Sequence, residues 1–444
     1  TAMIILWTDA LIFTLVVVMS ILIFTLGKQD SFLRPWKKVT SSRTGMASLV
    51  FLSFFLGIGL LDSLHFKPHV TQETEVMSAL DYWATGLRTQ QEKSYSAPFA
   101  AHLYSKALIQ QETGEATWGY ARLKYGASHL SNIPADKTAD IANKALQGLL
   151  KGMIVVGILY CCYHWFWQFS FGSTQSVNVV FGTLAVLVSV SYLLVELSGS
   201  YHVMGTDKVG EDVFYQTLKS IRTGLVIGSL TTLIMLPLAI IFGILAGFFR
   251  GWVDDVIQYI YTTLNSIPSV LLIAASILMV QVYMANHPEQ FTSLIVRADM
   301  RLLFLCLILG VTSWTGLCRL LRAETLKLRE MEYVQAAQSL GVPRYKILYQ
   351  HILPNLMHII LISVVLDFSG LVLAEAVLSY VNIGVDPTTY SWGNMINGAR
   401  LEMAREPVVW WSLAASFVFM FSLVLAANLF SDVVRDAFDP RRAD

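Results

Sequence analysis

The sequence predicts an all-α polytopic membrane protein with about nine membrane-spanning helices. First, 55% of its residues are hydrophobic and only 14% are charged, and the mean hydropathy is +0.56, which is too apolar for a soluble globular chain. Second, the apolar residues form runs long enough to cross ~30 Å of hydrocarbon, because a helix rises ~1.5 Å per residue. Third, basic residues gather in two short loops between such runs.

The predicted spans follow one another closely, apart from one hydrophilic stretch after the second span. We interpret the first apolar run as a span and not as a signal peptide, because no A-x-A-like cleavage site follows it. The runs cover approximately residues 3–26, 45–61, 148–169, 177–197, 223–249, 256–283, 302–318, 356–380 and 408–430.

The two basic loops predict the orientation of the chain in the membrane. Residues 27–44 carry five Lys or Arg against the single acid Asp30, and residues 319–355 carry six against three acids. Short loops rich in Lys and Arg stay on the cytoplasmic side. With an odd number of spans, the N-terminus and the stretch 62–147 are then outside and the C-terminus is cytoplasmic. The loops near Glu289 and Trp392 also fall outside.

The hydrophilic stretch 62–147 is predicted to be helical at 71–90, at 97–112 and at 135–147, where a helix behind Pro134 continues into the third span. Because it lacks nucleophile–base or metal-ligand spacing, packing on the outer ends of the spans is favoured over a catalytic domain. Basic and acidic residues number 31 each, so no global positive field would attract nucleic acid. The four cysteines show no C-x-x-C spacing, which argues against a zinc site.

The segment 324–355 is predicted to form a helix, a turn and a second helix at the cytoplasmic membrane surface. The first helix should end at Gly341, where glycine relieves left-handed strain, and Pro343 should open the second, which ends near Pro354. Val334, Ala337 and Leu340 share one face at helical spacing. We expect this small apolar face to enter a groove of another, cytoplasmic protein.

Four short motifs resemble landmarks of a known family. Gln335-Ala336-Ala337 with Gly341 and Ile352-Leu353-Pro354 resemble the EAA loop of ABC importer permeases. His202–Val213 (HVMGTDKVGEDV), Ser391–Met395 (SWGNM) and Arg435–Pro440 (RDAFDP) are similar to motifs of the C-type permease subunit of dipeptide, oligopeptide and nickel importers. The resemblance covers roughly 177–442. Gln335 stands where the motif usually has Glu, and Glu211 where the family often has Arg.

The resemblance implies a six-helix ABC importer permease core at 177–444, with its EAA-like coupling loop at 324–355. Three extra spans would precede the core, two within 1–61 and one at 148–176, and the insertion 62–147 would be periplasmic. Such a chain is the non-catalytic transmembrane subunit of an ATP-driven importer that moves di- or oligopeptides, or similar small solutes, across a bacterial inner membrane by alternating access. The absence of a G-x-x-x-x-G-K-[ST] motif agrees, because ATP and Mg would then be used by partner ATPase subunits.

The resemblance also implies the partners and two groups of site residues. The partners would be a B-type permease, two cytoplasmic ABC ATPases, a periplasmic solute-binding protein and membrane lipids, with no nucleic acid and no bound cofactor. Coupling to the ATPases would involve Glu332, Gln335, Ala336, Ala337, Leu340, Gly341, Ile352, Leu353 and Pro354. The periplasmic gate, or a contact with the binding protein, would involve His202, Gly205, Thr206, Asp207, Ser391, Trp392, Gly393 and Asn394.

Polar residues and helix breakers inside spans are candidates for the translocation path. A charge in a bilayer costs at least ~2.5 kcal/mol, and a broken helix leaves backbone groups that need protein or water partners. The candidates are Pro237, Asn265, Pro268, Asp367 and Glu375. Helix kinks for packing, and a Glu375 that holds helices together, are the competing interpretations. The alternative function is an ion- or proton-coupled secondary transporter using Asp367 and Glu375, but its inverted repeats are not visible in the sequence.

Overall fold

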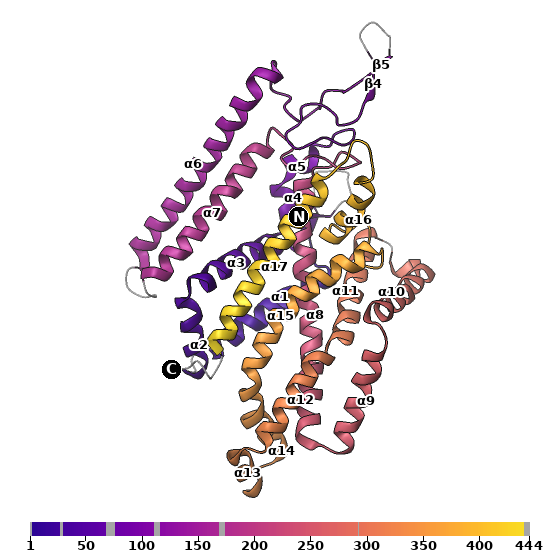
Figure 1. Ribbon diagram of the computed structural model, residues 1–444. Coiled ribbons are helices and arrows are strands. Elements are labelled where there is room, and N and C mark those ends of the chain that lie inside the picture. The colour runs from indigo at the N-terminus through magenta and orange to yellow at the C-terminus, as the bar shows by residue number, and fades with distance from the viewer. Residues whose placement is uncertain are drawn as a thin grey trace. The chain divides into compact units, whose positions relative to one another are not determined.

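The computed structural model describes residues 2–26, 30–67, 76–110, 116–167, 174–291 and 293–438, and these are mostly helical (Figure 1). The chain forms two compact units. Unit 1 comprises Thr1–Ile5, Lys37–Gly224 and Thr389–Ala426. Unit 2 comprises Leu6–Trp36, Leu225–Thr388 and Ala427–Asp444. Three helices run from one unit into the other: α2 (Asp30–Ser41), α8 (Val213–Phe249) and α17 (Trp411–Phe438).

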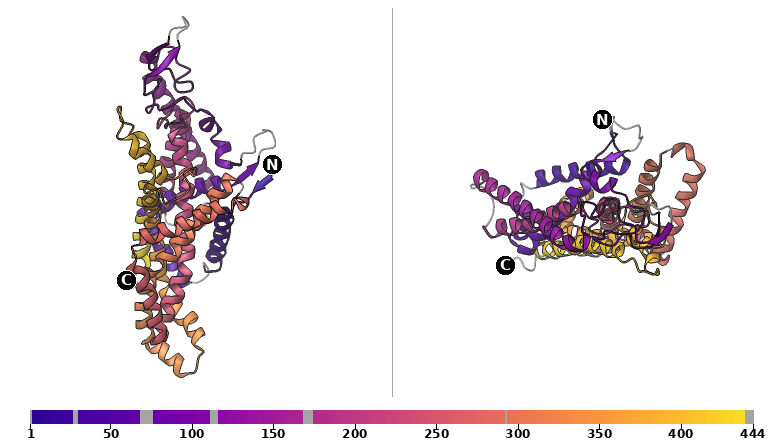
Figure 2. Two further views of the ribbon diagram at one scale, coloured as in Figure 1. Left: turned by 90° about the vertical axis from the view of Figure 1, so that its right-hand side faces the viewer. Right: turned by 90° about the horizontal axis from the view of Figure 1, so that it is seen from above.

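Unit 1 contains a long helical pair, α6 (Ile133–Trp167) and α7 (Thr174–Ser198), which lie side by side in Figures 1 and 2. Gly148 and Gly152, one turn apart in α6, permit this contact. A Cβ at Gly152 would lie 2.5 Å from the Cα of Ser189, and one at Gly148 would lie 2.7 Å from the Cα of Leu193. Small residues four apart are a common device for close helix packing in membranes. The other helices of the unit include α3 (Arg43–Asp62) and α16 (Trp392–Glu402).

The insertion of unit 1 is less helical than its sequence predicts. Its elements are β2 (His65–Lys67), β3 (Met77–Ser78), α4 (Ala79–Trp83), α5 (Thr85–Thr89), β4 (Ala107–Gln110) and β5 (Ala116–Gly119). β2 pairs antiparallel with both β3 and β1 (Ala2–Ile4), and β4 pairs with β5.

The helix predicted at 97–112 is therefore wrong, and 76–90 holds only two five-residue helices. Helix-forming composition does not reveal that the backbone of 107–110 finds its partners across a hairpin. The part of 71–90 before residue 76 lies outside the described residues. The predicted helix behind Pro134 is confirmed, because α6 begins at Ile133 and continues into the apolar run.

Unit 2 contains α1 (Trp7–Leu26) and most of the helices between Leu225 and Thr388. Its elements after α8 are α9 (Trp252–Ser266), α10 (Ser269–Asn286), η1 (Pro288–Gln290), α11 (Leu294–Ser313), α12 (Thr315–Arg329), α13 (Glu332–Ser339), α14 (Arg344–Ile347), η2 (Leu348–Ile352) and α15 (Leu353–Tyr380).

An all-α polytopic membrane fold is confirmed, but a count of nine spans is not. Within the described ranges, seven helices are long and apolar enough to cross a membrane. The predicted span 256–283 is divided at Ile267–Pro268 into α9 and α10. The predicted span 302–318 ends at Ser313, and its helix α11 carries Arg297, Asp299 and Arg301. Hydropathy averaged over a run does not show a break at its centre or charges before its start.

Helix α8 is continuous through Pro237, and its glycines pack against neighbouring helices. A Cβ at Gly243 would lie 2.8 Å from the Cβ of Leu321, and one at Gly247 would lie 2.6 Å from the Cβ of Thr325. Two glycines one turn apart thus bring α8 into close contact with α12. Pro237 does not interrupt the helix, and packing on α12 accounts for the two glycines.

Replacing Gly247 by Leu should destabilise the chain by about 1–3 kcal/mol, because the new side chain has no room beside α12. We expect a lower midpoint in thermal unfolding of the detergent-solubilised protein. Gly316→Ala in α12 is the matched control, since nothing lies within 4 Å of a Cβ built there. Equal midpoints for the two variants would show that α8 and α12 are not closely packed.

Candidate functional site

The segment from Glu332 to Ile352, which we call the coupling segment, forms the predicted helix and turn. α13 ends at Ser339, and Gly341 follows with the left-handed φ of +73°. The Gly341 N–H donates to Gln338 O at 3.0 Å, and the Val342 N–H donates to Ala337 O at 3.0 Å. This bond pattern ends a helix at a glycine. The predicted left-handed turn at Gly341 is confirmed.

The second helix is shorter and less regular than expected. α14 covers only Arg344–Ile347, and the π-helical turn η2 joins it directly to α15. Pro354 lies in the first turn of α15, and the second helix does not end there as predicted, because one helix continues from Arg344 to Tyr380. The chain therefore remains helical through Pro354. π-helical turns are rare in proteins as a whole, and those that occur are often found at functional sites.

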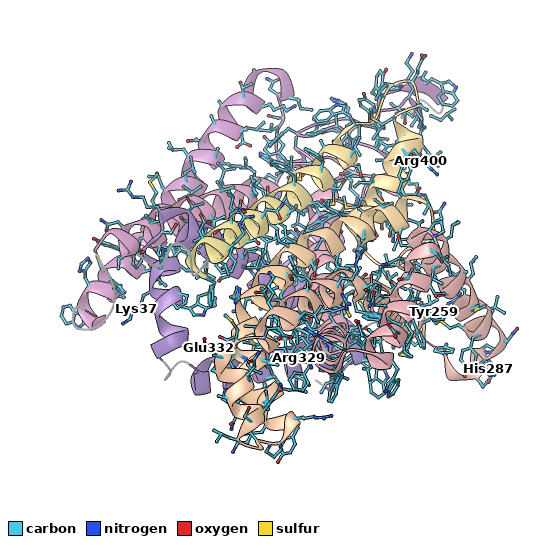
Figure 3. The ribbon with its side chains drawn as sticks, turned by 60° about the horizontal axis from the view of Figure 1, so that its bottom comes forward. Lys37, Tyr259, His287, Arg329, Glu332 and Arg400 are labelled. Atoms are coloured by element: carbon cyan, nitrogen blue, oxygen red, sulfur yellow. The ribbon has the colours of Figure 1, made fainter. Side chains whose placement is uncertain are left out.

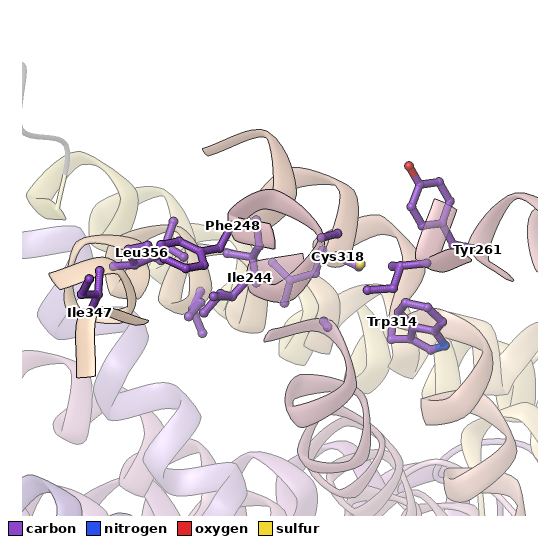
Figure 4. Close-up of a cluster of buried hydrophobic side chains, with 14 of the residues drawn as sticks. Ile244, Phe248, Tyr261, Trp314, Cys318, Ile347 and Leu356 are labelled. Carbon is purple, nitrogen blue, oxygen red and sulfur yellow. The ribbon is translucent and has the colours of Figure 1, made fainter. Parts of the chain in front are cut away.

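The coupling segment is held by an apolar core within unit 2. Val334, Ile347, Ile352 and Leu356 are fully buried, and they belong to one cluster with Phe248 of α8 (Figure 4). Ala337 is also buried there. The prediction that Val334, Ala337 and Leu340 form one docking face is therefore wrong. Helical periodicity shows that residues share a face, but it does not show whether another protein or the same chain covers that face.

A different group of residues is exposed on the coupling segment. Leu340 is 83% exposed, Tyr345 74% and Tyr349 72%. We call these three residues the coupling surface. The exposed cations Arg344 and Lys346 lie beside Tyr345 in the sequence. Sequence reasoning missed the two tyrosines, although their spacing of four residues in a short basic helix was a usable signal.

An ion pair and a hydrogen bond attach α12, which leads into the coupling segment, to its neighbours. Arg322 donates to both carboxylate oxygens of Asp254 in α9, at 2.5 and 2.6 Å. Arg329, labelled near Glu332 in Figure 3, donates to Phe248 O at 2.6 Å. A bidentate pair fixes geometry as well as distance. The coupling segment thus follows a helix, α12, that is fixed by side-chain contacts to α9 and α8.

The motif residues of the coupling segment lie partly on its surface. Glu332, Gln335, Ala336 and Pro354 are exposed. The Gln335 side chain donates to Glu330 O at 3.2 Å. A glutamate at this position could not donate that bond, so Gln335 has a local structural role that the usual residue would lack.

The candidates for the translocation path lie in different environments of unit 2. Glu375 is buried and accepts a hydrogen bond from Ser379 at 2.7 Å, whereas Asp367 is half-buried in the same helix. Asn265 accepts from Thr315 at 3.0 Å, and Pro268 follows the break between α9 and α10. Glu375 thus has a bond within its own helix. A place of Asp367 and Glu375 on the translocation path stays a prediction.

In unit 1, the predicted gate residue His202 lies in a buried ionic cluster with Asp212 and Glu92. His202 Nδ1 is 2.7 Å from Asp212 Oδ2, and Nε2 is 3.4 Å from Glu92 Oε1. The Glu92 carboxylate also accepts the backbone N–H groups of Lys124 and Tyr125, at 2.9 and 2.7 Å. We call His202, Asp212 and Glu92 the outer cluster. Glu92 has no motif around it, and the sequence did not indicate its role.

The outer cluster favours ionised side chains. Burial alone would raise the pKa of Glu92, but hydrogen bonds from His202 and from the N–H groups of residues 124–126 lower it to about 2. Burial alone would lower the pKa of His202, but hydrogen bonds to Asp212 and Glu92 raise it to about 9. At neutral pH the cluster therefore holds an imidazolium between carboxylates.

The Gly-Thr-Asp part of the outer motif contacts the insertion. Thr206 is fully buried, and its hydroxyl accepts the Ser96 N–H at 2.7 Å and donates to Ser94 O at 2.8 Å. Gly205 and Gly210 have φ of +72° and +81°, and a Cβ at Gly205 would lie 2.4 Å from Ser96 O. The His202 and Thr206 side chains are buried within the chain. The role of these residues in the periplasmic gate stays a prediction.

Asp207 and the SWGNM motif also make local bonds. Asp207 is partly exposed and accepts the N–H groups of Val209 and Glu211, each at 2.9 Å. Ser391 caps α16 by accepting the Asn394 N–H at 3.0 Å. Trp392 is buried with its indole N–H on Thr217 O at 3.2 Å. Gly393 is buried beside it. Of the terminal motif, Asp439 and Pro440 lie outside the described residues.

The fold and these sites define a polytopic helical membrane protein with a braced helical segment beside a spanning helix. Residues 239–444 match the family model described as binding-protein-dependent transport system inner membrane component. The dipeptide transport system permease protein DppC of Lactococcus lactis is 30% identical over 243 residues, which are 55% of this chain and 65% of that protein. The glutathione transport system permease protein GsiD of Pectobacterium atrosepticum is 31% identical over 244 residues, 54% of this chain and 73% of that protein.

The chain belongs to this family of binding-protein-dependent transport permeases, in its C-type branch, and is a multi-pass inner-membrane protein. The oligopeptide transport system permease protein OppC of Haemophilus influenzae is 25% identical over 358 residues, 80% of this chain and 99% of that protein. That alignment is too long to fit within 177–444. The sequence similarity to OppC therefore extends toward the N-terminus, beyond the region that the motifs covered. The chain spans just under two thirds of the length of the Lactococcus protein.

The raised pKa of His202 predicts a pH dependence of stability. The imidazolium contributes fully below the ordinary pKa of 6.5, and its contribution is lost as the pH rises through about 9. We expect the thermal midpoint of the solubilised protein to fall between pH 6.5 and 9, and to fall less in His202→Gln. Parallel curves for the two proteins would contradict an ionised His202.

Proposed function

We propose that the chain is one of two transmembrane subunits of an ATP-driven importer for di- or oligopeptides or similar small solutes. The names of DppC, OppC and GsiD support the substrate class, because these relatives are permeases for dipeptides, oligopeptides and glutathione. The observation that carries the proposal is the coupling surface, where large apolar side chains are exposed on a segment that its own core holds in place.

In this proposal the coupling surface seats in a cleft of an ABC ATPase. The apolar and basic side chains around Tyr345 suit a groove with apolar walls and acidic edges. ATP and Mg would be bound by two partner ATPases, and a B-type permease would complete the membrane path. A periplasmic binding protein would deliver the solute. The N-terminus would be periplasmic and the C-terminus cytoplasmic.

The contacts that fix α12 support a mechanical role of the coupling segment in this proposal. To shift an equilibrium from 1:99 to 99:1, ATP-driven closure must favour the outward-open state by ~5.5 kcal/mol. A flexible coupling segment would move without moving the spanning helices. The Arg322–Asp254 ion pair and the apolar cluster around Val334 hold this segment in a fixed position. Movement of the ATPases would then reach α15, which follows the coupling segment directly and carries the path candidates Asp367 and Glu375.

The complete importer, reconstituted in nanodiscs with its ATPases, tests this function. Addition of the binding protein loaded with a peptide should stimulate ATP hydrolysis, and proteoliposomes should accumulate the peptide only with ATP. Uptake driven by an ion gradient without ATP would support the secondary transporter instead.

The double variant Leu340→Ser, Tyr345→Ser should weaken binding of the ATPases by about tenfold or more, because both side chains are exposed anchors. Its thermal midpoint should be unchanged. Val334→Ser is the matched comparison, since Val334 is fully buried and its loss should lower the chain's own stability. A double variant that copurifies with normal amounts of ATPase would contradict the docking role.

Replacing Gln335 by Glu restores the usual residue and removes the bond to Glu330 O. An exposed ion pair to the ATPase contributes ~0–1 kcal/mol, so we expect ATPase affinity to change by no more than about fivefold. Uptake should persist. Complete loss of uptake with normal insertion would show that the partner's groove is built against a negative charge at this position.

A further inference from the structure

Backbone hydrogen bonds join the insertion to residues 202–212, which we call the outer loop. The Glu92 N–H donates to Gly210 O at 2.9 Å, the Thr206 N–H to Ser96 O at 3.0 Å, and the Phe99 N–H to His202 O at 2.9 Å. Residue numbers in the insertion rise from 92 to 99 while those of their partners fall from 210 to 202, so the two segments are antiparallel. The insertion and the outer loop are therefore attached to each other at three points within unit 1.

Glu92 connects three parts of unit 1 that are distant in sequence. Its carboxylate accepts the N–H groups of the 124–126 turn, at 2.7–3.2 Å, and its second contact is His202. Its backbone holds Gly210 in place, since a Cβ at Gly210 would lie 1.9 Å from Glu92 O. The atoms that a Cβ at Gly210 would meet are backbone atoms, which cannot move aside as the end of a flexible side chain could. The contact therefore requires a glycine at position 210, whereas any residue at position 92 would supply the same carbonyl group.

The outer cluster continues to the first turn of α8. Asp212 uses Oδ2 for His202, and it uses Oδ1 to accept the N–H groups of Phe214 at 2.8 Å and Tyr215 at 3.3 Å. A carboxylate at this position caps the helix and favours its dipole. The order of contacts is therefore the 124–126 turn, Glu92, His202, Asp212 and then α8, the helix that leads on into unit 2.

We propose that Glu92 is a positioning residue of the transport cycle: through His202 and Asp212 it orients the outer loop and the start of α8, so the insertion is an internal brace of the periplasmic gate. The proposal rests on the proposed function only where it refers to transport. It assigns to the insertion a role that does not require contact with a binding protein.

Among the described residues, the charged groups in contact with His202 are Asp212 and Glu92, and the other charges nearby have partners of their own. His202 faces Asp212 and Glu92, and the Lys124 ammonium lies over the Tyr125 ring, 4.9 Å from its centroid. The adjacent Tyr201 donates to Asp140, which also contacts His129 and Lys144. Arg122 donates to the carbonyl groups of residues 127, 128 and 130. Removal of the Glu92 charge thus leaves Asp212 as the remaining carboxylate in direct contact with His202 among the described residues.

The test compares Glu92→Gln, Glu92→Asp and Lys93→Gln in the complete importer in nanodiscs. Lys93 is the exposed neighbour and is the control for loss of a charge at the same place in the chain. Hydrogen exchange of residues 202–215 is measured first, because it requires no transport. We expect exchange to rise about tenfold or more in Glu92→Gln, to rise less in Glu92→Asp, and to stay unchanged in Lys93→Gln.

The second measurement is ATP-dependent uptake of a dipeptide between pH 6 and 9. Loss of the Glu92 charge should move the alkaline decline of uptake to lower pH by about one unit, which a purely structural role would not do. Glu92→Asp should restore the decline toward that of the wild type. If Glu92→Gln fails to assemble, the less disruptive Glu92→Asp still reports both exchange and pH profile.

Two outcomes would overturn the proposal. One is exchange in Glu92→Gln equal to that in Lys93→Gln. The other is increased exchange with an unshifted pH profile in an importer that transports normally. If the wild type transports no peptide, the proposed function fails, while the exchange measurement still decides whether Glu92 orients the outer loop.

Discussion

The close packing of α8 on α12 is the constraint on which the proposed coupling mechanism depends. Gly243 and Gly247 allow the two backbones to approach, and Leu321 and Thr325 fill the space that a larger side chain would need. Because α12 is fixed in this way, Val334 and Ile347 can bury themselves against Phe248, and the coupling segment gains a defined position. Without the packing of α8 on α12, the exposed coupling surface would belong to a mobile loop and could transmit little force to the spanning helices.

A second constraint acts in unit 1, where a buried ionic cluster adds to the apolar packing. His202 is charged between Asp212 and Glu92, and such a buried group is stable only while its partners remain in place. The two ends of α8 therefore differ in chemistry. In unit 1 its first turn contacts an ionic cluster that responds to pH, whereas in unit 2 its last turns contact an apolar cluster and the Arg329 side chain.

The extra N-terminal residues are better integrated than a six-helix core with additions would suggest. The insertion shares backbone hydrogen bonds with the outer motif, and its Glu92 completes the environment of a motif residue. The long alignment with OppC agrees with this view, since it extends beyond the motif region. The domain boundaries at residues 61, 147 and 176 stay predictions, because the two compact units divide the chain at other positions.

The sequence by itself determined the membrane class, the helix and turn at Gly341, the helix behind Pro134 and the family. Each depends on local information: the length of an apolar run, the conformational freedom of one glycine, or residues adjacent in a motif. Only the tertiary structure decided that Val334 is buried while Tyr345 is exposed, that 107–110 is a strand, and that Glu92 contacts His202. Glu92 and His202 are 110 positions apart. Periodicity and motif spacing carry no information on which distant segments cover one another, so burial and ionic pairing had to be read from the folded chain.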